Sequence, residues 1–226
     1  MSITNISPTV YKFLKELNKN NDREWFELHK KEFKIEESSF KKFFNELYNE
    51  MNTYDEIDKI KIFRIYRDVR FSKNKTPYKT HLSGSFHRVK PRLRGGYYIH
   101  IEPNNTFIAC GFWDPEATDL LRIRKEFEMD DTEIRKLIND KNFIKIFGKL
   151  EGDALKTAPK GFDKEHSAID LIRMKQYIAI RRFTDKEAME PDFMKKINES
   201  YKAARPWFNY MSEVLTTDLN GVSLID

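Results

Sequence analysis

Residues 97–110, YYIHIEPNNTFIAC, are the stretch that most clearly indicates the fold. Apolar Tyr97, Ile99 and Ile101 alternate with polar or amphipathic side chains. The latter are Tyr98, His100 and Glu102. A period of two followed by Pro-Asn-Asn predicts an antiparallel hairpin with one apolar and one polar face.

The same alternation recurs in the runs 59–62, 81–89 and 176–183, and apolar residues at helical spacing occupy much of the rest of the chain. Helices are expected over residues 8–20 and 22–51, with an irregularity near 35–39. Further helices are expected from residue 114 through Ile123, over 131–147, and over 191–204 and 206–219. The order of helices, strands, helices, strand and helices predicts an α+β fold. We expect a single domain, residues 1–226, with a mainly antiparallel central sheet, an N-terminal helical pair and C-terminal helices packed around it.

Composition excludes several classes of protein. With 39% hydrophobic and 14% aromatic residues among 226, the chain is not intrinsically disordered. It contains neither an apolar run of about 20 residues nor a signal-like N-terminus, so we expect a cytoplasmic protein with no membrane partner. Cys110 is the only cysteine, which excludes an internal disulfide and a multi-thiolate zinc site and favours a small core residue.

Positive charge is concentrated in one segment. The net charge is +5, but residues 59–96 carry 12 Lys and Arg against one acid, Asp68. Arginine and lysine bind phosphate or carboxylate, and aromatic rings offer stacking faces, so the segment predicts a basic, aromatic-lined pocket for a phosphate-bearing or other anionic ligand. The candidate binding residues are Arg64, Arg67, Arg70, Lys73, Lys75, Tyr78, Lys79 and His81. The alternative is a set of solvated charges on strands and loops.

Asp68 is expected to be buried and bonded to backbone amides or to a neighbouring arginine, Arg67 or Arg70, because it is otherwise left among uncompensated cations. On that interpretation, Asp68→Asn destabilises the fold.

The polar faces of the strands supply candidates for chemistry. Asp68, His100 and Glu102 are the candidate catalytic residues for general acid and base steps. His81, His100 and Glu102 are also enough to hold a metal, with Asp68 as a fourth ligand or an orienting group. Since the spacing is not diagnostic and strand histidines more commonly form hydrogen bonds, no metal ligand is assigned and the cofactor stays unknown. We do expect His81, His100 and Glu102 to share a sheet face.

Three functional interpretations therefore stay open. The first is a module that binds an anionic small molecule, and the second is a hydrolase, metal-assisted or acid/base, that uses the same pocket. The third is a nucleic-acid-binding or scaffold protein, in which phosphate contacts dominate or the arginines pair with internal carboxylates. The oligomeric state is open.

Several motifs together resemble one family. They are FLKELNKNNDREWF (13–26), RIYRDVRFSKNKTPYKTH (64–81), YYIHIEP (97–103), GFWDP (111–115), LLRIRKEF (120–127) and PKGFDKEHSAIDLIRMK (159–175). In this order over most of the chain they are similar to domain of unknown function 2461, found in bacteria and fungi, with Asn74 in place of an expected acid. The resemblance implies a single-domain α+β protein of about this length and implies no reaction.

Overall fold

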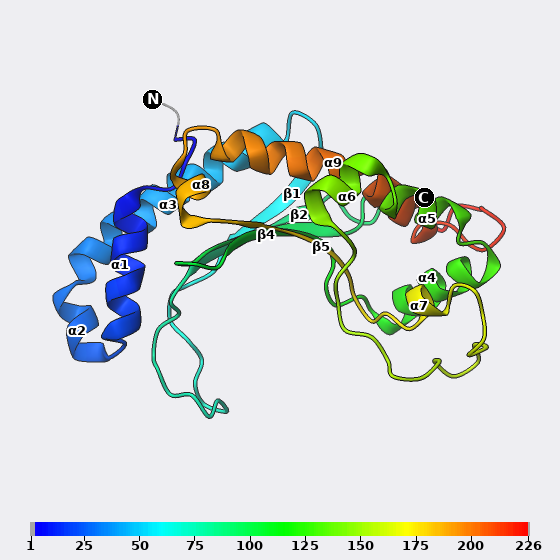
Figure 1. Ribbon diagram of the computed structural model, residues 1–226, viewed down its shortest axis with the longest axis horizontal. Helices are drawn as coiled ribbons and strands as arrows, with labels where there is room; N and C mark the ends of the chain where they lie inside the picture. The colour runs from blue at the N-terminus through cyan, green and yellow to red at the C-terminus, as the bar shows by residue number, and fades with distance from the viewer. Residues whose placement is uncertain (1–2, 226) are drawn as a thin grey trace. The chain divides into compact units, whose positions relative to one another are not determined.

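The computed structural model describes residues 3–225, which form an α+β structure around one five-stranded antiparallel sheet (Figure 1). The strands are β1 (Ile57–Ile62), β2 (Leu82–Arg88), β3 (Gly96–Ile101), β4 (Thr106–Phe112) and β5 (Tyr177–Phe183). They lie side by side in the order β1-β2-β3-β4-β5, so the late strand joins the sheet as expected. The predicted fold class is confirmed.

Helices occupy both ends of the chain and the connection between β4 and β5. Before the sheet lie α1 (Pro8–Lys19), α2 (Arg23–Leu28) and α3 (Lys30–Met51). Between β4 and β5 lie α4 (Ala117–Met129), α5 (Thr132–Ile138), α6 (Lys141–Phe147) and α7 (Ile169–Ile172). After β5 come α8 (Asp185–Met189) and α9 (Phe193–Val214). Within residues 3–225, no helix is both long and apolar enough to cross a membrane.

Three helix boundaries differ from the sequence-based expectation. The irregularity expected near residues 35–39 lies instead at His29, and α3 continues unbroken through that region. The expected helix 131–147 is divided into α5 and α6, and Asp140 caps the start of α6 by accepting from two backbone amides. The two closing helices are one, with Pro206 inside α9. The neighbouring Trp207 and Phe208 are buried, and this packing offsets the backbone hydrogen bond that proline removes.

The chain divides into two compact units. The first contains the residues up to Phe86 together with Tyr98–Ile108 and Arg182–Glu199, and the second contains His87–Tyr97, Ala109–Arg181 and the residues from Ser200. Each of the strands β2 to β5 therefore has one end in each unit. The single domain 1–226 stays a prediction.

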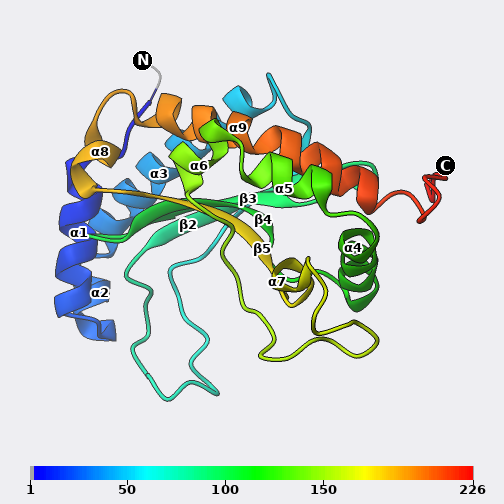
Figure 2. The same cartoon turned by 45° about the vertical axis from the view of Figure 1, so that its right-hand side comes forward.

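In the first unit, α3 covers one face of the sheet. The ring of Phe44 in α3 stacks on Phe86 in β2 with centroids 4.1 Å apart. Gly84 makes this approach possible, because a Cβ there would lie 2.3 Å from Phe44 Cε2. Since side chains alternate along a strand, the residues of β2 next to Gly84 and Phe86 point away from α3. Figures 1 and 2 show α3 on one side of β1 and β2 and the connection between these strands extending from the other.

In the second unit, aromatic side chains form the core around α9 and β4. Trp207 packs edge-on against Phe112 and Phe143, with centroids 5.9 and 6.0 Å away. Cys110 in β4 is buried, and burial raises the pKa of its thiol, which confirms the expected core role. Gly111 follows with a φ of 144°, in a region that side-chain-bearing residues rarely adopt.

Candidate functional site

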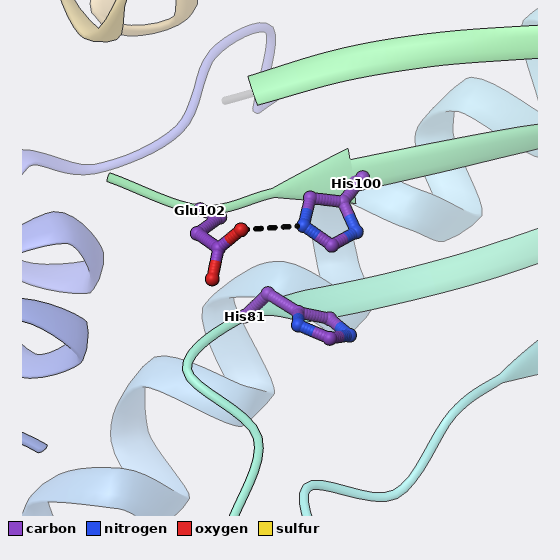
Figure 3. A group of neighbouring side chains, drawn as sticks. All are labelled: His81, His100 and Glu102. Carbon is purple, nitrogen blue, oxygen red and sulfur yellow. Dashed lines mark hydrogen bonds and ion pairs between the residues drawn. The ribbon is translucent and has the colours of Figure 1, made fainter. Parts of the chain in front are cut away.

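His81, His100 and Glu102 come together on the sheet face that points away from α3. His81 directly precedes β2, His100 lies in β3, and Glu102 follows the end of β3. One ligand atom of each residue lies within 4.8 Å of the others. Figure 3 shows the His81 ring beside that of His100, with Glu102 bonded to His100. The predicted shared face is confirmed, and we call these three residues the triad.

A hydrogen-bond network fixes the acidic member of the triad. Glu102 Oε2 lies 3.1 Å from His100 Nε2, and the Asn105 amide donates to the same oxygen at 2.7 Å. The Thr80 hydroxyl donates to Glu102 Oε1 at 2.6 Å. Both carboxylate oxygens are therefore held in place by groups from the turn after β3 and from the segment before β2.

His100 is held on both sides. The Tyr98 hydroxyl lies 3.0 Å from His100 Nδ1, opposite the bond to Glu102. The imidazole stacks on Phe107 at 4.7 Å between ring centroids and lies 4.1 Å from the ring of His81. Only 8% of His100 is exposed. Its ring orientation is therefore determined by packing as well as by hydrogen bonds.

The surroundings set the protonation states. Burial, the neighbouring His100 and, more weakly, Lys79 lower the pKa of His81 to about 4. Burial also lowers the pKa of His100, against the opposing effect of Glu102. Burial acts to raise the pKa of Glu102, but hydrogen bonds from Thr80, Asn105 and His100 outweigh it and hold that pKa below its ordinary value. At neutral pH the triad thus consists of two neutral imidazoles and a carboxylate, the states in which these groups bind metals.

Residues 63–80 of the basic segment form an extended connection between β1 and β2, which we call the arm (Figure 2). Tyr66 and Tyr78 pair across it as an isolated antiparallel bridge. Tyr78, a predicted ligand-binding residue, stacks on Phe26 of α2 at 4.0 Å, and the side chain of Asn21 bonds both its amide and its carbonyl. Tyr78 therefore attaches the arm to the N-terminal helices.

Towards the tip, three predicted ligand-binding residues bond to the arm itself. The Arg67 guanidinium donates to the carbonyl and hydroxyl oxygens of Thr76, and Lys75 donates to the Val69 carbonyl at 2.9 Å. Arg70 binds Asp68. Lys73 is exposed, and Arg64 and Lys79 lie near the base of the arm. The pocket predicted from these cations stays a prediction.

Asp68 differs from its expected state. Its side chain is 48% exposed, so the prediction of burial is wrong, whereas the predicted pairing with arginine is confirmed. Arg70 Nε and Nη2 donate to the two carboxylate oxygens at 3.0 and 2.7 Å. Because the partners are two residues apart in one turn, they pair without leaving solvent. The destabilisation expected for Asp68→Asn loses its basis, and the triad does not include Asp68.

A cavity of about 540 Å³ adjoins the triad on the side of Glu102 and Thr80. Residues of α1, the turn after β3 and α8 line the rest of it, including Lys12, Lys15 and Asp185. Lys15 and Asp185 form an ion pair across it at 3.3 Å. Sequence reasoning missed this cavity, because its walls come from segments far apart in the chain.

Sequence reasoning also left Thr80 and Asn105 out of the site. Thr80 directly precedes His81, and Asn105 belongs to the predicted turn, so proximity in sequence to the triad was the available signal. Tyr98 was placed on the polar face by alternation, but its bond to His100 required the structure.

Comparison with known proteins gives a family and no activity. No curated protein matches the chain. No solved structure matches it either. A family model described as "Conserved hypothetical protein (DUF2461)" matches residues 9–210. That match covers most of the chain and includes the motifs of the arm, the β3 hairpin and the segment before β5. The chain therefore belongs to the DUF2461 family.

Proposed function

We propose that the protein is a metal-dependent hydrolase in which His81, His100 and Glu102 hold a divalent ion. The observation that carries the proposal is the convergence of their ligand atoms within 4.8 Å on a partly buried sheet face. Two histidines and one glutamate are a ligand set of hydrolytic zinc sites, in which water occupies the fourth position. With bonds of about 2.0–2.2 Å, ligand atoms around tetrahedral zinc lie about 3.3–3.6 Å apart, so small side-chain rotations close the site.

The surrounding hydrogen bonds suit this role. Metal-binding histidines usually donate their other ring N–H to an oxygen that orients the ring. If Nε2 of His100 bound the ion, Nδ1 would carry the proton, and the Tyr98 hydroxyl lies 3.0 Å from Nδ1 to accept it. Ser83 is a further side-chain partner of Tyr98 and can accept the hydroxyl hydrogen. Thr80 and Asn105 hold the Glu102 carboxylate in the same way.

The chemistry is the cleavage of a bond by water. A zinc ion held by the triad would lower the pKa of its bound water to about 7 and would so supply a nucleophilic hydroxide at neutral pH. Its oxygen bonds to the electrophilic atom of the substrate while the bond to the leaving group breaks, and the proton from water ends on the leaving group. The charge of the arm supports an anionic substrate, in keeping with the anion-binding role predicted for residues 64–81.

Zinc titration of metal-stripped protein tests the proposal. We expect one zinc ion per chain, and we expect His81→Ala and His100→Ala each to weaken zinc binding at least about 100-fold through loss of a ligand. His87→Ala is the matched control, because His87 lies at the other end of β2 and is exposed. Equal affinities in all variants, or no zinc binding by the unaltered protein, would contradict the metal site.

A second candidate function is binding of single-stranded nucleic acid by the arm. Phe71 is 96% exposed, and the guanidinium of Arg70 lies 5.9 Å from its ring centroid. An exposed ring among cations can stack on a base while lysine and arginine contact phosphates.

Fluorescence anisotropy with a labelled single-stranded oligonucleotide tests this candidate. Phe71→Ala is expected to weaken binding about 5-fold to 100-fold, as loss of one stacking contact does. Leu28→Ala, which removes another exposed apolar side chain, should leave the affinity unchanged. Equal affinity for Phe71→Ala, or binding that does not weaken with salt, would reject the candidate.

A further inference from the structure

Three cations gather at the base of the arm, beside the triad, and they form no ion pair within the described part of the chain. They are Lys61 in β1 and Arg64 and Lys79 on the two sides of the arm, and both Lys61 and Arg64 lie close enough to Lys79 to act on its charge. Arg67, Arg70 and Lys75 instead bond to groups of the arm, as Arg70 does with Asp68. The three basal cations therefore remain available for an anion from outside the chain.

Packing places two of these cations, Lys61 and Lys79, near the triad, and Lys79 lies close enough to His81 to act on its charge. The Nζ atoms of Lys61 and Lys79 lie 5.1 and 5.5 Å from the centroid of the Phe63 ring. That ring lies 6.2 Å from the ring of Tyr98, whose hydroxyl bonds to His100. The charges are thus one aromatic side chain away from a residue that orients the triad.

Like charges in one place repel, and an anion bound among them relieves that repulsion. Lys79 is half-buried, so its charge is less screened by water than that of a fully exposed lysine. The ammonium groups of Lys61 and Lys79 both lie beside the Phe63 ring. Such an arrangement suits a compact anion with several oxygens that can accept from different directions.

We infer that Lys61, Arg64 and Lys79 form a subsite for a phosphate group, and that the substrate of the triad is a phosphate ester. The inference rests on the proposed function and names its substrate class. Phosphate fits better than carboxylate, because its additional oxygens and second charge match three cations rather than one bidentate arginine.

The reaction that follows is hydrolysis of the ester. The oxygen of water bonds to phosphorus, the bond between phosphorus and the ester oxygen breaks, and a proton from water ends on that oxygen. An alcohol and inorganic phosphate are released, with no change in oxidation state. The subsite cations stabilise the negative charge on the phosphoryl oxygens during transfer.

Binding of inorganic phosphate is the first test. The variants Lys61→Gln, Arg64→Gln and Lys79→Gln are each expected to weaken phosphate binding at least about 5-fold, since each removes one charge-assisted contact. Lys59→Gln is the matched control. Lys59 precedes Lys61 by two residues on the same face of β1, and its substitution removes the same charge. Equal losses in all four variants would show a diffuse charge effect and overturn the subsite. Acetate should compete poorly; competition equal to that of phosphate would overturn the choice of phosphate over carboxylate.

Turnover of p-nitrophenyl phosphate by the zinc-loaded protein is the second test. We expect the subsite variants to raise KM more than they lower kcat, while Lys59→Gln changes neither. His81→Ala should abolish turnover and still bind phosphate. If the protein binds zinc but the subsite variants bind phosphate as tightly as the unaltered protein, the subsite alone is overturned. If the protein binds phosphate at the subsite but does not bind zinc, the proposed hydrolase alone is overturned.

Discussion

Gly111→Ala is expected to destabilise the protein by about 4 kcal/mol or more, the size of a severe steric substitution. A Cβ at this position of β4 would lie 2.1 Å from the backbone carbonyl oxygen of Tyr177 in the neighbouring strand β5. Backbone of a paired strand cannot move aside as a flexible side chain can. The φ of 144° adds strain, because it lies where residues with a Cβ are unfavourable.

Gly161→Ala separates the steric effect from the effect of positive φ. Gly161 has a φ of 86°, but a Cβ there would meet nothing within 4 Å, so we expect a cost of about 1–2 kcal/mol. Urea unfolding followed by circular dichroism gives both free energies. Similar losses for the two variants would show that crowding between β4 and β5 is not what requires glycine at position 111.

Acidification of the metal-free protein is expected to remove about 2 kcal/mol of stability through His81. The pKa of His81 is about 4 in the folded chain, against 6.5 for an unperturbed histidine. The unfolded chain therefore takes up the proton first as the pH falls. The stabilisation is complete above about pH 6.5, declines through the interval below it, and is lost by about pH 4. The figure allows for partial exposure of the ring.

The pH effect is measured by urea unfolding of chelator-treated protein at about pH 7 and about pH 5. His81→Asn should reduce the loss of stability between these two values, because it removes the titrating ring. His87→Asn serves as the control and should behave as the unaltered protein does. An unchanged pH dependence in His81→Asn would show that the low pKa of His81 does not contribute.

Local patterns predicted the elements that hold the triad. Apolar residues at helical spacing over residues 8–20 indicated α1, and the alternation from Tyr97 onward indicated β3 and the faces of its side chains. Because period two is a property of the extended backbone, His100 and Glu102 had to share a face whatever the register. The neighbouring strand then brought His81 to the same place.

Properties that depend on distant segments could not be predicted in this way. The exposure of Asp68 depends on what covers the arm, and no local pattern encodes that. The continuity of α9 through Pro206 depends on burial of the adjoining aromatic residues, which outweighs the local preference of proline. The role inferred for Lys61 depends on where Phe63 and Lys79 lie across the base of the arm.

Burial of Cys110 makes the sheet accessible to kinetic measurement without an engineered label. The thiol lies in β4, between β3 and β5, and its raised pKa keeps it protonated as well as covered. A thiol reagent can react with it only when this part of the sheet opens. With one cysteine in the sequence, every labelled molecule records the same event, so the labelling rate as a function of denaturant distinguishes local fraying from global unfolding.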